Sequence, residues 1–369
     1  ERLEHKNIQI SAAPEVSLLD GAEPSFSGIE ADLATVRGIC SDRSRPLAER
    51  LEAYEDLYES EVGDTILSRP TNIEREVGLR QVYLKFEGDN PSGTQKDRIA
   101  FAQAMDALRR GFDAMTVATC GNYGVAVAFA ASLAGLRCIV YVPESYHTHR
   151  IEEMDRYNAE VLRVPGDYET VVEVSRVRAA AEEIYDANPG GANTALQLQA
   201  YGEIAYEIYD ELRDAPAVVA VPVSNGTTLA GIYKGFASLY RRGKTSRIPK
   251  MVAGSSFGKN PIVQAFRKNE PRCGNLMPER IRETAVNEPL INWHSIDGDL
   301  ALDAVRETDG WASYASDRAM ASYARTIRES EGLSVLPAAT AGLIALLDGH
   351  RQRTLTNDRY VVVVTGRRA

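Results

Sequence analysis

Short apolar runs alternate with amphipathic helical patterns along most of this chain, and that alternation constrains its fold more than any other feature. The runs are apolar without a break, as in strands buried on both faces. Such strands form parallel sheets covered by helices on either side. We therefore predict an α/β fold with parallel-sheet, three-layer domains. The predicted strands are 82–86, 114–118, 138–142, 160–164, 217–223, 250–254 and 360–364, and the predicted helices are 95–110, 125–134, 150–157, 168–187, 200–212 and 229–240.

Residues 1–60 form a polar N-terminal extension ahead of the alternating part. Its best regular element is a helix at 46–60, where apolar residues recur at helical spacing: Leu47, Leu51, Tyr54 and Leu57. The first residues of the chain lack the apolar core of a secretory signal. Nowhere does an apolar stretch reach the ~18 residues that cross a membrane. We therefore expect a cytoplasmic protein without a membrane partner.

Composition argues against other partners. The net charge of −10 disfavours a nucleic-acid partner, because phosphate binding requires a positive surface. His147 and His149 have no carboxylate or cysteine partner at a metal-binding spacing, so we expect no metal. Four cysteines without C-x-x-C spacing are interpreted as reduced thiols: Cys40, Cys120, Cys138 and Cys273.

Lys96 follows a turn-rich loop, 90–95, and stands at the start of a predicted helix. The N-terminus of a helix carries a charge of about +0.5, which lowers the pKa of a nearby lysine. A lysine amine with a lowered pKa is a competent nucleophile toward an aldehyde. The alternative interpretation is a solvated surface lysine.

A second loop, Ser224-Asn225-Gly226-Thr227-Thr228, connects a predicted strand to a predicted helix. Ligands of open α/β sheets bind beyond the carboxyl ends of the strands. Backbone N–H groups at a helix N-terminus, with hydroxyls beside them, form a phosphate cradle. This loop suits a single phosphate better than a dinucleotide. The alternative is an ordinary N-cap turn.

Two further loops follow predicted strands. The loop Thr119-Cys120-Gly121-Asn122-Tyr123-Gly124 lacks the first glycine of a dinucleotide fingerprint. Its amides could instead bind a substrate carboxylate, and Asn122 could hydrogen-bond a phenolic oxygen on a cofactor ring. Thr365, directly after the last strand, could meet a heterocycle nitrogen.

Together these loops resemble those of the tryptophan synthase β superfamily, the fold type II enzymes that use pyridoxal 5'-phosphate (PLP), and within it the threonine synthase branch. The similarity runs from about 63 to 366, with the motifs in the family's order. Asn90-Pro91-Ser92-Gly93-Thr94-Gln95-Lys96-Asp97-Arg98 matches the family's Asn-Pro-Thr-Gly-Ser-Phe-Lys-Asp-Arg. The other matching blocks are Gly121-Asn122, Pro222-Val223-Ser224-Asn225-Gly226-Thr227, Gly258-Lys259-Asn260-Pro261-Ile262-Val263-Gln264-Ala265-Phe266 and 361–366.

The resemblance implies a role for each matched residue. Lys96 holds PLP as a Schiff base and, once released, serves as general base at Cα. Asn122 pairs with the phenolic oxygen, and Thr365 faces the pyridine nitrogen. Because a neutral hydroxyl cannot keep that nitrogen protonated, prompt expulsion of a β or γ leaving group is favoured. The implied phosphate ligands are Ser224, Asn225, Gly226, Thr227 and Thr228, and the substrate-binding residues are Thr119, Cys120, Gly121, Tyr123 and Gln199.

The resemblance also implies a domain arrangement. A smaller mobile domain, 86–205, is nested within a larger PLP-binding domain formed by 1–85 and 206–369. Substrate binding closes the cleft between them. The family resemblance further suggests a homodimer.

Three departures from the threonine synthase pattern concern the substrate. Threonine synthases bind the phosphate of phosphohomoserine with an arginine in a block like Asn-Pro-x-Arg-Leu-Glu-Gly-Gln-Lys. The matching stretch here is 195–203, and Gln199 stands where the arginine would be. Glutamine offers no charge and no five-donor fork. Tyr123 replaces a small hydroxyl residue, and Leu336-Pro337 replaces the usual Glu-Pro.

We therefore expect a threonine synthase-like PLP enzyme that catalyses elimination or replacement at Cβ or Cγ of a small amino acid, O-activated or not. A threonine/serine dehydratase-type ammonia-lyase is the alternative reaction. A non-catalytic binding protein with the same fold is the alternative class. A phosphorylated substrate would still fit if Arg150 or Lys259 supplied the charge missing at Gln199.

Overall fold

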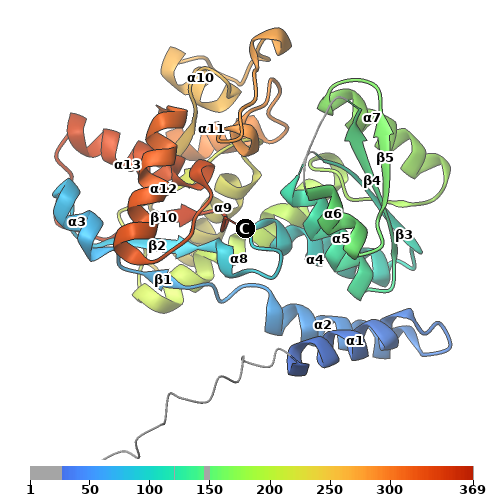
Figure 1. Ribbon diagram of the computed structural model, residues 1–369. Helices are drawn as coiled ribbons and strands as arrows, with labels where there is room; N and C mark the ends of the chain where they lie inside the picture. Colours follow the sequence, from blue (N-terminus) through green and yellow to red (C-terminus); the bar gives the residue numbers. More distant parts are fainter. Residues whose placement is uncertain (1–26, 120, 145–149, 369) are drawn as a thin grey trace, which may run out of the picture.

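The computed structural model describes residues 27–119, 121–144 and 150–368, which form two sheets (Figure 1). The larger sheet has the order β1 (Leu67–Ser68), β2 (Val82–Phe86), β10 (Tyr360–Val364), β7 (Val218–Pro222), β8 (Lys250–Ser256) and β9 (Trp311–Ala315). The smaller sheet has the order β5 (Glu160–Val164), β4 (Arg137–Pro143), β3 (Ala114–Ala118) and β6 (Tyr185–Asp186). Every pairing is parallel except that of β1 with β2, which is antiparallel.

The last strand of the chain, β10, lies between β2 and β7 inside the larger sheet. Val362 pairs with Leu84 on one side and with Ala220 on the other. All of its residues are buried, as its uninterrupted apolar sequence requires. The larger sheet is therefore assembled from segments on both flanks of the smaller one.

Both faces of each sheet are buried, which confirms the predicted three-layer α/β fold. In β10, Val361 and Val363 pack into one hydrophobic cluster, whereas Val362 and Val364 pack into another. In β4, Val140 and Val142 are separated in the same way from Ile139 and Tyr141. Alternate side chains of a strand point to opposite faces, so each sheet has a core on either side.

Thirteen helices accompany the two sheets in the described ranges (Figure 1). They are α1 (Ser27–Ser41), α2 (Leu47–Glu61), α3 (Thr71–Val77), α4 (Lys96–Arg109), α5 (Asn122–Leu133), α6 (Arg150–Arg156), α7 (Tyr168–Ala181), α8 (Thr194–Leu212), α9 (Thr227–Arg241), α10 (Pro261–Lys268), α11 (Gly298–Glu307), α12 (Asp317–Glu331) and α13 (Ala341–Gln352). Of these, α1 and α2 pack on α4 and α5 rather than on a sheet. None of the helices in the described ranges is long and apolar enough to span a membrane.

Most predicted elements are confirmed to within a few residues. The helix predicted at 200–212 begins earlier, at Thr194, and another element is corrected. The helix predicted at 168–187 ends at Ala181. Glu183 has a φ of 53°, in the left-handed region that an α-helix cannot contain. Residues 185–186 then pair with Met115 and Thr116 as β6. Sequence reasoning assigned no elements to β9 or to α10–α13.

Candidate active site

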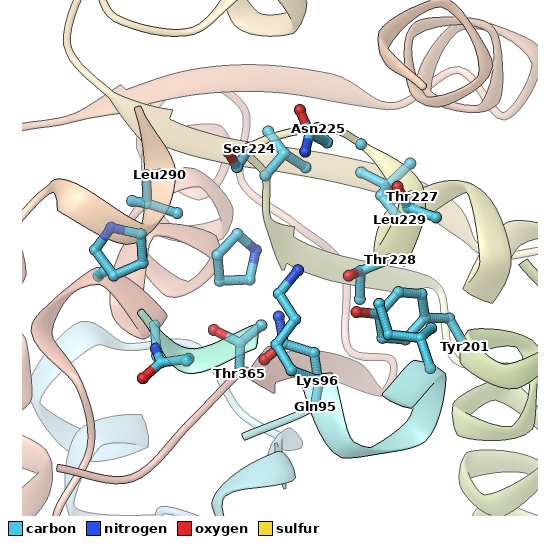
Figure 2. Close-up of a pocket in the computed structure, with 18 of the residues that line it drawn as sticks. Gln95, Lys96, Tyr201, Ser224, Asn225, Thr227, Thr228, Leu229, Leu290 and Thr365 are labelled. Carbon is cyan, nitrogen blue, oxygen red and sulfur yellow. The ribbon is translucent and has the colours of Figure 1, made fainter. Parts of the chain in front are cut away.

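The C-terminal segment places Thr365 beside the Lys96 loop. Thr94 and Gly366 form an antiparallel bridge. The Gln95 N–H donates to the Thr365 carbonyl at 3.1 Å, and the Arg367 N–H donates to the Gly93 carbonyl at 2.9 Å. These backbone contacts join two loops that are far apart in sequence, and Figure 2 shows Lys96 and Thr365 at the same cavity.

Lys96 is the first residue of α4, and its side chain extends toward the Ser224–Thr228 loop (Figure 2). Burial of the amine lowers the pKa of Lys96 to about 8. The shift has the direction expected from the sequence. Its physical origin is that removing an ammonium group from water disfavours the charged form. The site therefore holds a lysine with a substantial neutral fraction near neutral pH.

A buried ion-pair network anchors the start of α4. Arg98 donates to both carboxylate oxygens of Glu87, at 2.6 and 2.9 Å, and to both of Glu207, at 2.7 and 2.9 Å. Lys85 on β2 also pairs with Glu207. Burial alone would raise the pKa of Glu207, but Arg98 and Lys85 outweigh it and lower the pKa to about 2. The network fixes α4 against β2 and α8, and sequence reasoning did not predict it.

The Ser224–Thr228 loop forms the turn into α9, as predicted. Gly226 has a φ of +93°, and a Cβ there would lie 2.8 Å from Ala301 Cβ and 2.9 Å from the Asp297 carbonyl. Only glycine fits this conformation and this space. The first N–H groups of α9 have no partner within the helix and can bind an anion.

Several polar groups of this loop make hydrogen bonds to the segment 292–297. The Asn225 Oδ1 accepts from Asn292 Nδ2 at 3.0 Å, and Thr227 Oγ1 donates to the Asp297 carboxylate at 2.6 Å. The Ser224 carbonyl accepts from Ser295 Oγ at 3.0 Å. Thr227 is therefore placed to contact a phosphate through its backbone, whereas Asn225, with only its oxygen engaged, can offer its side-chain NH₂ as well as its backbone.

Two residues of α8 line the cavity although sequence reasoning did not select them. The Tyr201 hydroxyl is buried, lies next to Thr228 in Figure 2, and makes no hydrogen bond of normal geometry with the described residues. Gln197 is fully buried, and its Nε2 donates to Gln103 Oε1 at 3.0 Å. Their spacing of four residues places both on one face of the helix, which is the sequence signal that could have identified them.

The placement predicted for Gln199 is wrong. Gln199 is exposed and lines a surface groove with Tyr58 and Glu203, not the cavity at Lys96. Two residues along an α-helix rotate a side chain by about 200°. Since Gln197 faces the cavity, Gln199 must face the opposite side of α8.

A wider cavity of about 460 Å³ adjoins the first and shares Lys96 and Asn122 with it. It is lined by Thr119, Gly121 and Tyr123, three of the residues that the resemblance assigns to substrate binding. Tyr123 contributes its ring, because its hydroxyl donates to the Ala187 carbonyl at 2.7 Å. Cys120, His147 and His149 lie outside the described residues.

Among the described residues, the charges that line the wider cavity are mostly negative. The carboxylates are Asp167, Glu169, Glu283 and Glu288, and the single cationic side chain is Lys96. Neither of the two alternative cations lines the cavity. Arg150 binds Asn122 and Glu153, whereas Lys259 donates to the Arg282 carbonyl.

These features fit PLP. The cradle at Gly226 excludes any Cβ, as a backbone that approaches a phosphate requires. The Tyr201 hydroxyl offers a buried donor beside Thr228 that makes no hydrogen bond of normal geometry with the described residues. Lys96 offers an amine with a lowered pKa between that cradle and Thr365.

The family model described as pyridoxal-phosphate dependent enzyme matches residues 58–366. The chain belongs to this family. Its cofactor is therefore PLP, as predicted. The threonine synthase of Methanocaldococcus jannaschii is 29% identical over 305 residues, which are 82% of this chain and 74% of that protein. The threonine synthase of Methanosarcina acetivorans is 27% identical over 342 residues, which are 92% of this chain and 82% of that protein.

The fold also matches solved structures of this PLP class. The serine racemase of maize has a TM-score of 0.70 and 18% identity, with 86% of this chain and 94% of that chain covered. At this identity the likeness concerns the fold alone. The chain is thus a fold type II PLP enzyme whose sequence is similar to threonine synthases.

Proposed function

We propose that this PLP enzyme catalyses elimination or replacement at Cβ or Cγ of a small, unphosphorylated amino acid. The observation that carries the proposal is that the Lys96 amine shares one cavity with the Ser224–Thr228 loop and with Thr365. PLP, when bound, supplies an electron sink for bonds at the substrate's Cα. The other chemical roles belong to this chain's own residues.

Lys96 attaches the cofactor and then moves a proton at Cα. Both roles require a neutral amine, and the pKa of about 8 provides one near neutral pH. Thr365 presents a neutral hydroxyl to the ring nitrogen. The amides at the start of α9, with Ser224, Thr228 and Tyr201 beside them, hold the phosphate. On the substrate side, the space for the amino acid is lined by Thr119, Gly121 and Tyr123.

The charge of the wider cavity supports an unphosphorylated substrate. A phosphate there would meet several carboxylates, and each close pair of like charges costs on the order of a few kcal/mol. Glu169 is the exception at neutral pH, because burial raises the pKa of its carboxyl to about 7. This lining also favours the second candidate, a threonine/serine dehydratase-type ammonia-lyase, whose substrates carry only a hydroxyl as leaving group.

The cofactor assignment is tested by the visible absorption of the purified protein after addition of PLP. Wild type should develop the band and the Lys96→Ala variant should not, with Lys259→Ala as the surface-lysine control. A band retained in Lys96→Ala, or missing from wild type, would contradict the assignment and leave the non-catalytic alternative.

The substrate is tested by screening the holoenzyme for turnover and spectral change. Threonine, serine, O-acetylated amino acids and phosphohomoserine form the panel. We expect responses from unphosphorylated members. Efficient turnover of phosphohomoserine would refute the charge argument while leaving the PLP assignment intact.

We further propose that 86–205 moves as a smaller domain against the rest of the chain, and that the enzyme is a cytoplasmic homodimer. The confinement of the smaller sheet to 114–186 supports the nested arrangement. Light scattering tests the dimer, and fractionation of the source cells tests the compartment. Identical interdomain geometry in substrate-free and substrate-bound crystals would contradict domain closure.

A further inference from the structure

Arg150 is in direct contact with Asn122, the residue that the family resemblance places at the cofactor ring. Its Nη2 donates to Asn122 Oδ1 at 2.6 Å. Arg150 begins α6 and Asn122 begins α5. A guanidinium group has donors only, so the amide atom that faces it must be the carbonyl oxygen. The amide nitrogen of Asn122 therefore points away from Arg150.

The guanidinium is itself held in place. Arg150 Nη1 donates to both carboxylate oxygens of Glu153 at 2.7 Å, and the Arg150 side chain is only 12% exposed. A planar guanidinium held by a carboxylate has little freedom to turn. Its orientation therefore fixes the orientation of the Asn122 amide.

Asn122 lines both cavities together with Lys96. With its oxygen engaged, the polar group it can offer to the cofactor is the NH₂ donor. A donor to an oxyanion stabilises the charged form and lowers its pKa, and hydrogen bonding at the amide oxygen strengthens the donor. We propose that Arg150 is a positioning residue that orients Asn122 so that its amide N–H donates to the anionic phenolic oxygen of PLP.

This inference rests on the proposed function, but its readout is separate. Formation of a visible band reports PLP attachment, whereas the pH at which the band changes reports how strongly the phenolic oxygen is stabilised. The test uses holoenzyme without substrate. The measured quantity is the midpoint of the pH titration of the visible band. In the Arg150→Met variant we expect this midpoint to rise by about one pH unit, a tenfold change in proton affinity. In Arg150→Lys, which keeps one donor, we expect part of that shift.

The matched control is Arg156→Met, at the other end of α6, because Arg156 is exposed. It should leave the midpoint unchanged. The titratable groups that line the two cavities are present in every variant, so none of them is lost or gained: Lys96, Tyr123, Asp167, Tyr168, Glu169, Tyr201, Glu283 and Glu288.

A double-mutant cycle with Asn122→Ala decides whether Arg150 acts through Asn122. In the Asn122→Ala background, Arg150→Met should produce no further shift. An equal shift in both backgrounds would indicate a direct charge effect and would overturn the proposal, as would a wild-type midpoint in Arg150→Met. If Arg150→Met fails to bind PLP, Glu153→Gln serves instead. It keeps the arginine but loosens it, and should shift the midpoint upward by less; a midpoint equal to that of wild type would overturn the proposal.

Discussion

Replacing Tyr201 with phenylalanine should weaken PLP binding while slightly stabilising the apoenzyme. The hydroxyl is buried without a hydrogen-bond partner of normal geometry among the described residues. Burial raises the pKa of Tyr201, so the group stays protonated and can act as a donor. Phenylalanine should keep the ring in place, because α8 and α9 pack closely here. An added Cβ at Gly231 of α9 would lie only 2.6 Å from Tyr201 Cβ.

The two effects have opposite signs. A hydrogen bond to a charged group contributes about 1.5–3 kcal/mol. Because about 1.4 kcal/mol changes an equilibrium constant tenfold, loss of a bond to the phosphate should lower PLP affinity roughly 10- to 100-fold. In the apoenzyme the same hydroxyl lies beside Thr228 without a hydrogen bond of normal geometry to the described residues, and an unsatisfied buried polar group costs up to about 1–3 kcal/mol. Tyr201→Phe should therefore raise the apoenzyme Tm slightly.

The assay is a spectroscopic titration of apoenzyme with PLP and, in parallel, with pyridoxal, which lacks the phosphate. The affinity loss should appear with PLP and be absent with pyridoxal. Tyr206→Phe, on the outer side of α8, is the matched control. Equal losses with both ligands, or no loss with either, would refute the assignment of Tyr201 to the phosphate.

Three further predictions follow from the same contacts. The rate of PLP attachment to Lys96 should rise with pH and level off above about 8, because only the neutral amine reacts and burial lowers its pKa to about 8. Stopped-flow absorbance measures this rate, and a rate that does not vary with pH would contradict the prediction. Glu207→Gln should cost about 3–5 kcal/mol of unfolding free energy at pH 7, because Arg98 loses a buried partner. The pKa of Glu207 is lowered from 4.5 to about 2, so the wild-type advantage should be complete above about pH 4.5 and fade as the pH falls toward 2; urea titrations that show a constant difference would argue against the network. Gln199→Ala should leave kcat/KM within about twofold, whereas Gln197→Ala should lower it roughly tenfold, because only Gln197 belongs to the buried network at the cavity. If a steady-state assay shows the larger loss in Gln199→Ala, Gln199 is the substrate-binding residue that the motif alignment indicated.

The error at Gln199 has a tertiary cause. Gln199 was selected by matching a motif, but which side of a helix faces a cavity depends on how that helix packs. The glycines of α8 and α9 set that packing: an added Cβ at Gly235 would lie 2.5 Å from the Gly202 carbonyl oxygen. This contact turns Gln197 and Tyr201 toward the cavity. The motif alignment selected residue 199 instead of residue 197, because an alignment carries no information on how the two helices pack.

The local sequence by itself determined the α/β class, the start of α4 at Lys96 and the turn at Gly226, because burial pattern, helix starts and positive φ depend on neighbouring residues. Only the tertiary structure determined which residues surround Lys96. The bridge between Thr94 and Gly366 brings Thr365 to it, the bonds of Glu207 hold its helix, and Arg150 orients Asn122. Each of these contacts joins residues from separate segments of the chain, and their geometry exists only once those segments have folded together.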